Sequence, residues 1–127
     1  MQKSFNQEGD HVLTSVASIL RANVRNTDVL ARYGGEEFGI ILPESNLNTG
    51  REVAEKIRSS IEKLNFSSKP DRTIKLTASF GVSSSSANKN INDVDLLHLA
   101  DQALYQSKRN GRNTVTLHTE LDSSHFI

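Results

Sequence analysis

Apolar residues recur along the chain at helical spacing in three segments that are separated by more polar stretches. In the first and third segments they fall at offsets of 0, 1, 4, 7 and 8, which places them on one face of a helix. The middle segment carries a similar stripe from Val53 to Leu64. The pattern therefore predicts three amphipathic helices, over residues 9–24, 48–64 and 93–110.

Residues at two of these helix ends suit the backbone groups that a helix leaves unpaired. Asp10 stands just before the first apolar stripe, where a carboxylate can cap free backbone N–H groups. Gly111 follows the third helix, where the chain commonly adopts a positive φ that glycine tolerates. We expect these two residues to mark a helix start and a helix end.

Short apolar runs predict strands between the helices. Residues 29–33 and 38–42 flank a pair of glycines, so together they indicate a β-hairpin. The second run is apolar at nearly every position and is expected to be buried on both faces. Alternating apolar residues over 74–80 predict a strand that faces the core on one side, and residues 115–117 mark a last short strand.

The order of elements is then α-β-β-α-β-α-β, for which we expect a mixed β-sheet with helices covering one face. A chain of 127 residues fits one domain, 1–127, and leaves no room for two. The segment 119–127 is expected to be a frayed tail.

Composition narrows the classes of function. The 15 basic and 15 acidic residues give a net charge of zero, which argues against a nucleic-acid-binding surface and a polybasic membrane anchor. The absence of cysteine excludes disulfides, thiol nucleophiles and cysteine-ligated zinc. The sequence has no apolar stretch long enough for a membrane segment and no signal-peptide pattern at its start, so we expect a cytoplasmic location.

The hairpin carries the candidate chemistry. Gly34 and Gly35 allow a tight turn and the close approach of a ligand, because no side chain is in the way. Glu36 and Glu37 follow, and a tight turn could aim both carboxylates at one Mg²⁺ ion, which prefers such oxygen ligands. Taken alone, these residues fit a hairpin turn with solvated acids better than they fit a metal site.

Longer motifs favour the site. Four segments resemble, in the same order, the signature blocks of the GGDEF family of diguanylate cyclase domains. They are residues 9–13 (GDHVL), 32–38 (RYGGEEF), 77–82 (TASFGV) and 100–113 (ADQALYQSKRNGRN). The resemblance covers roughly residues 9–117, and Ser107 stands where the family usually has alanine.

The resemblance implies a palm-like α/β sandwich, similar to polymerases and nucleotidyl cyclases. It also implies the condensation of two GTP molecules into cyclic di-GMP with release of pyrophosphate, by two domains that face each other as a homodimer. Two Mg²⁺ ions would lower the pKa of the attacking 3′-hydroxyl and neutralise developing phosphate charge. The usual partner of such a domain is an upstream sensor or receiver domain.

The family's site residues carry over by position. The resemblance makes Glu36 a metal-binding acid, and it makes Glu37 a second acid that acts on metal or on the attacking hydroxyl. The substrate-binding residues that it implies are Gly34 and Gly35 beside GTP, Asp10 at the guanine edge, and Lys108 and Arg112 on the triphosphate. Alternatives remain open, because Asp10 can be a plain helix cap, and Lys108 and Arg112 can be solvated charges on one helical face.

Arg25 and Asp28 form an R-x-x-D pattern, with five residues between it and Gly34. This spacing resembles the family's inhibitory site, where cyclic di-GMP binds back. An arginine fork can hold a phosphate or a guanine edge in bidentate fashion, and an aspartate can accept from guanine N–H groups. The alternative is a surface ion pair after a helix, worth about 0–1 kcal/mol.

The chain departs from the family at its start. The family's first helix and first strand, with a metal-binding Asp, would precede residue 1, and its guanine-reading Asn falls on Met1. We expect the missing strand to leave unpaired backbone groups beside the hairpin, and we expect weak GTP binding and slow or no turnover. A fragment of a longer cyclase, a processed or mis-started chain, and a degenerate domain that swaps an element remain open.

Two other functions remain open as well. One is a catalytically inactive module that binds cyclic di-GMP through Arg25 and Asp28, and the other is a purely structural dimerisation unit.

Overall fold

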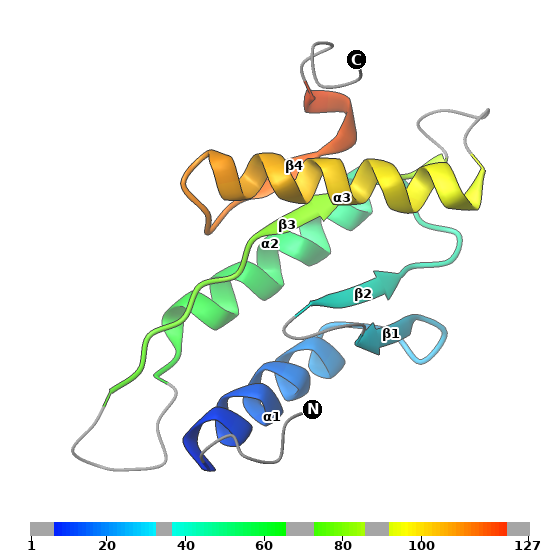
Figure 1. The fold of residues 1–127 in the computed structure, drawn as a ribbon. Helices are drawn as coiled ribbons and strands as arrows, with labels where there is room; N and C mark the ends of the chain where they lie inside the picture. Colours follow the sequence, from blue (N-terminus) through cyan, green and yellow to red (C-terminus); the bar gives the residue numbers. More distant parts are fainter. Residues whose placement is uncertain (1–6, 33–36, 66–72, 86–91, 122–127) are drawn as a thin grey trace.

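The computed structural model describes residues 7–32, 37–65, 73–85 and 92–121, and these form three helices and four short strands (Figure 1). In chain order the elements are α1 (Gln7–Ala22), β1 (Val29–Arg32), β2 (Phe38–Ile41), α2 (Leu47–Lys63), β3 (Phe80–Val82), α3 (Asp93–Arg109), β4 (Val115–Leu117) and the 3₁₀ helix η2 (His118–Glu120). The predicted order α-β-β-α-β-α-β is confirmed. None of the helices in the described part of the chain has both the length and the hydrophobicity that crossing a bilayer requires.

Helix caps explain where two of the helices begin. The side chains of Asn46 and Asn92 accept hydrogen bonds from the backbone N–H groups of Thr49 and Asp95, at 2.8 and 2.9 Å. By contrast, α1 begins at Gln7, so Asp10 lies inside its first turn. The prediction that Asp10 is an N-cap is therefore wrong.

The end of α3 follows the prediction made from Gly111. This residue has φ of +108°, and the Arg112 amide donates to the Ser107 carbonyl at 2.9 Å. A hydrogen bond that spans five residues across a left-handed residue is the Schellman arrangement, which satisfies carbonyls at a helix end.

β1 and β2 form the predicted antiparallel hairpin, with Val29 opposite Ile41 and Arg32 opposite Phe38. The prediction that β2 is buried on both faces is wrong, because Ile41 is 63% exposed. Phe38 and Ile40 pack on the core, and strand alternation turns the residues between and after them to the other face. That face has little described structure over it, so the apolar run does not mean full burial.

β3 and β4 pair in parallel, with Phe80 opposite Val115 and Val82 opposite Leu117. The strand predicted over 74–80 is only partly formed, since β3 begins at Phe80 and Lys75 makes only a single bridge, to Asn65. The predicted alternation does hold over most of this segment, because its apolar side chains pack against the core while Lys75 and Thr77 between them are exposed.

The four strands form two separate two-stranded sheets, and within the described ranges no ladder joins β2 to β3. This agrees with the expectation of unpaired backbone groups beside the hairpin. Figure 1 shows the hairpin and the β3–β4 pair as distinct units, with α1 and α2 beside them. The main core cluster joins α1 and α2 through Leu20, Ile57 and Ile61, and partly buried side chains of both sheets pack against it.

Helices lie on both faces of β3, which corrects the expectation that they cover one face. A Cβ at Gly81 would come within 2.2 Å of the Ala100 carbonyl oxygen and the Leu104 nitrogen in α3. The next residue, Val82, lies against Gly50 of α2, where a Cβ would come within 2.9 Å of it. Because neighbouring strand residues face opposite sides, α3 and α2 enclose β3 between them (Figure 1).

Candidate functional site

Only part of the glycine-acid hairpin lies within the described residues. Gly34, Gly35 and Glu36 lie outside them, while Glu37 directly precedes β2. The Glu37 side chain is exposed and makes no hydrogen bond or ion pair with the described part of the protein. Asp10 is placed only by its backbone, in the first turn of α1, and its side chain also lies outside the description.

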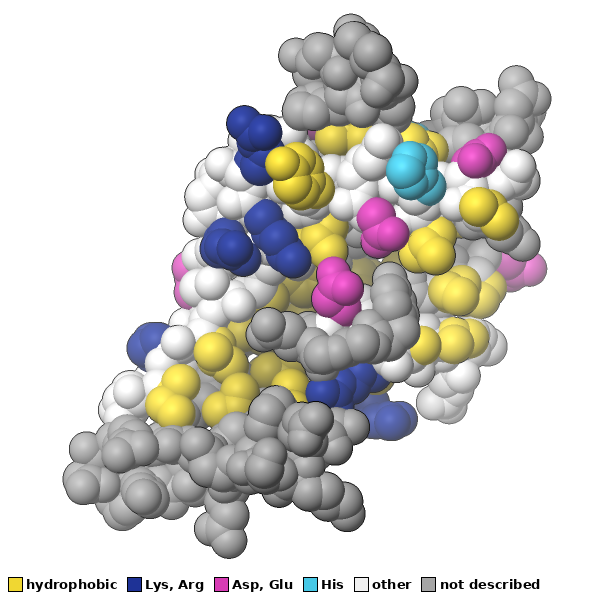
Figure 2. All heavy atoms as spheres, in the orientation of Figure 1, with side chains coloured by type: hydrophobic (Ala, Val, Ile, Leu, Met, Phe, Trp, Pro, Cys, Tyr) yellow, Lys and Arg dark blue, Asp and Glu magenta, His cyan; other side chains and the backbone are white. Residues whose placement is uncertain are grey.

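Lys108 lies in the last turn of α3, whereas Arg112 lies three residues beyond the helix end, in the left-handed turn that follows Asn110. The expectation that the two cations share one helical face is therefore wrong. Both side chains are exposed, and neither forms an ion pair with the residues that the structure describes. Figure 2 shows Lys and Arg side chains gathered at this end of the helix. Cations are favourable at a helix C-terminus, so the position alone stabilises them, but the lack of carboxylate partners also leaves both available to an external anion.

β2 and α3 run in opposite directions in Figure 1. The start of β2, which Glu37 precedes, and the end of α3, which carries Lys108, therefore lie toward the same side of the view. Glu37 therefore belongs to the hairpin sheet, whereas Lys108 belongs to α3, which packs on β3 of the other sheet.

A magnesium site fits the donor chemistry only in part. Across the described ranges, no group of three or more His, Asp or Glu side chains is arranged to hold a metal ion. Glu37 offers one exposed carboxylate without a competing partner, which suits a cation that takes one or two carboxylates and completes its shell with phosphate oxygens and water. Glu37 therefore fits as one ligand of such an ion.

The turn after α3 is held by side chains that the sequence analysis did not single out. Asn113 accepts a hydrogen bond from Arg58 Nη1 at 2.9 Å and donates one to the Glu62 carboxylate, so two residues of α2 hold it. Its backbone N–H donates to Ser79 Oγ at 3.1 Å. We call Asn113, Arg58, Glu62 and Ser79 the Asn113 network.

Charge supports this network. The hydrogen bond from Asn113 lowers the pKa of the Glu62 carboxyl, and the nearby Arg58 guanidinium adds to the effect. The hydrogen bonds to Glu55 raise the pKa of Arg58, whose side chain is only 17% exposed. Both groups are therefore charged near neutral pH. In the sequence, the only sign of these contacts was the spacing of Glu55, Arg58 and Glu62, which are three and four residues apart and so can pair on one helix.

Arg25 and Asp28 form a closed turn at the end of α1. The Asp28 carboxylate accepts from the Arg25 backbone N–H at 2.6 Å and from its Nη2 at 2.9 Å, and the Asp28 amide donates to the Arg25 carbonyl. The Asp28 side chain is 2% exposed, whereas that of Arg25 is 57% exposed. Hydrogen bonds from Arg25 hold the pKa of the Asp28 carboxyl below its ordinary value.

Arg25 also reaches across to a second turn. Its Nη2 donates to the Pro43 carbonyl and to Ser45 Oγ, both at 3.0 Å. The arginine therefore connects the α1–β1 turn to the β2–α2 turn, which is more than a local surface ion pair. Its Nη1 atom makes no hydrogen bond with the described residues.

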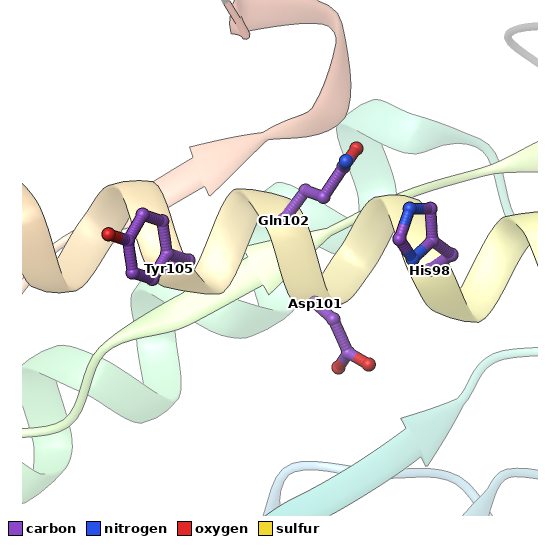
Figure 3. A pocket seen from close by; sticks show the side chains of 4 residues that line it. All are labelled: His98, Asp101, Gln102 and Tyr105. Carbon is purple, nitrogen blue, oxygen red and sulfur yellow. The ribbon is translucent and has the colours of Figure 1, made fainter. Parts of the chain in front are cut away.

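An open pocket of about 270 Å³ lies on α3 and was not predicted from the sequence. It is lined by His98, Asp101, Gln102 and Tyr105, which share one side of the helix (Figure 3). Their side chains spread apart, and Asp101 and Gln102 point in opposite directions. Because these polar groups do not converge on one point, they cannot bind one small ligand together.

Comparison with known proteins shows what this arrangement resembles. The family described as "Diguanylate cyclase, GGDEF domain" matches residues 6–114. Diguanylate cyclase A of Treponema denticola is 44% identical over 110 residues, which cover 86% of this chain and 29% of that protein. Diguanylate cyclase DosC of Escherichia coli K12 is 38% identical over 109 residues, which cover 86% of this chain and 23% of that protein. The chain thus spans less than a third of these relatives.

Solved structures agree with the sequence match. The GGDEF domain of DgcB from Caulobacter crescentus, in complex with c-di-GMP, superimposes with a TM-score of 0.80 at 30% identity, covering 91% of this chain and 67% of that one. The active GGEEF domain of a diguanylate cyclase from Vibrio cholerae gives a TM-score of 0.73 at 29% identity, covering 91% and 72%. The expected α/β fold is confirmed, and the chain belongs to the GGDEF family of diguanylate cyclase domains.

Proposed function

We propose that this chain is the GTP-binding catalytic part of a diguanylate cyclase, which condenses two GTP molecules into cyclic di-GMP and releases pyrophosphate. The observation that carries the proposal is the pair Lys108 and Arg112, exposed and without carboxylate partners at the end of α3. Two cations that approach each other repel unless an anion lies between them, and a triphosphate is such an anion. Because the chain belongs to the diguanylate cyclase family, we take this anion to be the triphosphate of GTP.

The reaction is a phosphoryl transfer that occurs twice. The 3′-oxygen of one GTP forms a bond to the α-phosphorus of the other, the bond to the pyrophosphate leaving group breaks, and the hydroxyl proton is lost. Repetition of the step in the opposite sense closes the ring. Because each domain holds one GTP, the proposal requires a homodimer in which two hairpins face each other.

Each residue has a proposed task. Glu36 and Glu37 would hold Mg²⁺, which when bound lowers the pKa of the 3′-hydroxyl and offsets charge on the phosphates. Gly34 and Gly35 leave room for the nucleotide against the backbone, and Asp10 accepts from the guanine edge. Lys108 and Arg112 bind the β- and γ-phosphates and so orient the α-phosphate for attack.

We also propose which domain accompanies this chain and where the protein is located. Since the chain spans less than a third of its curated relatives, we propose that an upstream sensor or receiver domain controls the dimer. A cytoplasmic location is proposed with it, because GTP and Mg²⁺ are supplied there.

The test is product formation by a chimera. The chain is joined behind the corresponding N-terminal segment of the Treponema denticola cyclase and incubated with GTP and Mg²⁺, while pyrophosphate and cyclic di-GMP are measured. We expect product formation that Glu36→Ala and Arg112→Ala abolish or reduce at least tenfold, whereas the exposed Lys56→Ala has the wild-type rate. A folded chimera that makes no cyclic di-GMP would overturn the proposal.

A second candidate function is cyclic di-GMP binding at Arg25 and Asp28. Asp28 holds the Nε and Nη2 atoms of the Arg25 guanidinium, which leaves Nη1 able to donate to a phosphate or guanine oxygen. Calorimetry with cyclic di-GMP is expected to give micromolar or tighter binding that Arg25→Ala abolishes. Arg51→Ala, which removes another exposed arginine, should retain it. Equal binding by the wild-type chain and Arg25→Ala would exclude the site.

A further inference from the structure

We propose that Asn113, held by Arg58 and Glu62 of α2, is a positioning residue that sets the conformation of Arg112 for phosphate binding. The proposal rests on the proposed function, because it assumes that Arg112 contacts the triphosphate. It adds residues from α2, an element that carries none of the predicted site residues.

The backbone around Arg112 needs an external constraint. Gly111, Arg112 and Asn113 have φ values of +108°, +65° and +50°, so three successive residues lie in the left-handed region. Glycine adopts this region freely and asparagine tolerates it, but for arginine it is unfavourable. A conformation of this kind persists only where the surrounding structure holds it in place.

The Asn113 network supplies that constraint from two sides. Both polar atoms of the Asn113 side chain are used, one as an acceptor from Arg58 and the other as a donor to Glu62. The Asn113 amide donates to Ser79 Oγ, in the segment that leads into β3. The turn is thereby tied to α2 and to the approach to β3.

Arg58 is itself immobilised before it reaches Asn113. Its Nε and Nη2 atoms donate to the two Glu55 oxygens, at 2.6 and 3.0 Å. A guanidinium held on one edge by a carboxylate presents its remaining N–H groups in fixed directions, because the fork is planar. The contact with Asn113 therefore connects a rigid donor to the turn.

Arg112 has no comparable contact of its own. Its side chain is exposed and unpaired among the described residues, and only its backbone N–H is fixed, by the Ser107 carbonyl. The direction in which its guanidinium leaves the chain depends on the local φ and ψ. If the Asn113 network is lost, the turn can relax, and the Arg112 guanidinium then no longer leaves the chain in one fixed direction.

The test uses Asn113→Gly, which removes the side-chain hydrogen bonds but keeps a residue that tolerates positive φ. GTP affinity of the same chimera is measured by calorimetry with Mg²⁺, and inorganic triphosphate serves as a second probe. We expect Asn113→Gly to weaken GTP binding about tenfold, as the loss of one charge-assisted contact would. In an Arg112→Ala background it should cause no further loss.

Two variants of Glu62 separate positioning from general damage. Glu62→Gln keeps an oxygen that can accept from Asn113 and should bind GTP like the wild type, whereas Glu62→Ala should weaken binding. Glu52→Ala, which removes an exposed carboxylate from the same helix, is the matched control and should have no effect. Urea unfolding of each variant identifies any loss of the fold.

The outcomes distinguish the inference from the function on which it rests. If Arg112→Ala weakens GTP binding but Asn113→Gly does not, or if their effects add, the positioning role is wrong while the proposed function stands. Hydrogen exchange at the Arg112 amide gives a readout without nucleotide, and we expect it to be at least tenfold faster in Asn113→Gly. Unchanged exchange would also overturn the inference. If the chimera with the wild-type sequence of this chain binds neither GTP nor triphosphate, both proposals fail.

Discussion

The hydroxyl groups of Ser107 and Thr116 are 2.7 Å apart in the interior and are joined by a hydrogen bond. Ser107 also lies 2.7 Å from the Phe80 carbonyl oxygen, which can only accept. Ser107 therefore donates to Phe80, and Thr116 donates to Ser107, so one buried serine joins α3 to both strands of the parallel pair.

This arrangement predicts the cost of removing the serine. Ser107→Ala leaves the Thr116 hydroxyl and the Phe80 carbonyl without their partner, and we expect it to lower the free energy of unfolding by about 1–3 kcal/mol. Ser107→Ala/Thr116→Val removes both hydroxyls and should be less destabilised than the sum of the single variants. Urea unfolding measures all three, and additive losses would contradict the shared hydrogen bond.

The close approach of α3 to β3 predicts a contrast between two glycines. Gly81→Ala forces a methyl group into the backbone of α3, at 2.2 Å, and neither partner can yield without separating helix and strand. We expect it to destabilise the fold by about 3 kcal/mol or more. Gly50→Ala meets only the end of the Val82 side chain, at 2.9 Å, and should cost clearly less. Thermal unfolding compares the two, and equal losses would be inconsistent with the packing.

His118 predicts a dependence of stability on pH. Burial lowers the pKa of its imidazole, and its Nδ1 atom has no hydrogen-bond partner, so a proton there would be buried and unpaired. The unfolded chain then binds more protons than the folded one below the ordinary pKa of about 6.5. The free energy of unfolding should therefore have its full value above that pH and should decrease as the pH is lowered toward 5.

The comparison that isolates this effect uses two histidines. Urea unfolding at pH 7.5 and pH 5.5 should show a smaller pH-dependent loss in His118→Gln than in the wild type. The exposed His98 provides the control, and His98→Gln should keep the wild-type slope. An unchanged slope in His118→Gln would assign the pH dependence to other groups.

Glu37 predicts a separation of metal binding from folding. Its side chain is exposed and unpaired within the described ranges, so Glu37→Gln should leave the urea midpoint unchanged. If Glu37 holds Mg²⁺ beside GTP, the rise in melting temperature that Mg²⁺ and GTP produce together should be lost in this variant. Glu36→Ala should behave in the same way, and a collapse of the fold in either variant would instead make the acid structural.

The local elements could be predicted from the sequence because they depend on periodicity. The stripe from Leu96 to Leu104 identified α3, and Gly111 identified its end, since both signals are short-range. The exposure of Ile41 could not be predicted, because it depends on which element covers the second face of the hairpin. The same holds for the two helices that enclose β3.

The candidate site divides in the same way. Motifs pointed to Lys108, Arg112 and Glu37, whose availability depends on the side chain itself and its near neighbours. They did not reveal Arg58, which reaches Asn113 across 55 residues of chain, or the contact from Arg25 to Pro43 across 18. Such contacts depend on how helices and turns meet in three dimensions, and no local pattern encodes them.

The bare backbone at Gly81 also constrains how α3 can move. The backbone of α3 packs directly on Gly81, the one position in β3 where no side chain separates them. Sliding or rolling of the helix would therefore break its contact with β3 at Ala100 and Leu104. Lys108 lies one helical turn after Leu104, so its position is fixed by the same helix–strand contact. A conformational change that moves Lys108 must therefore move β3 together with α3.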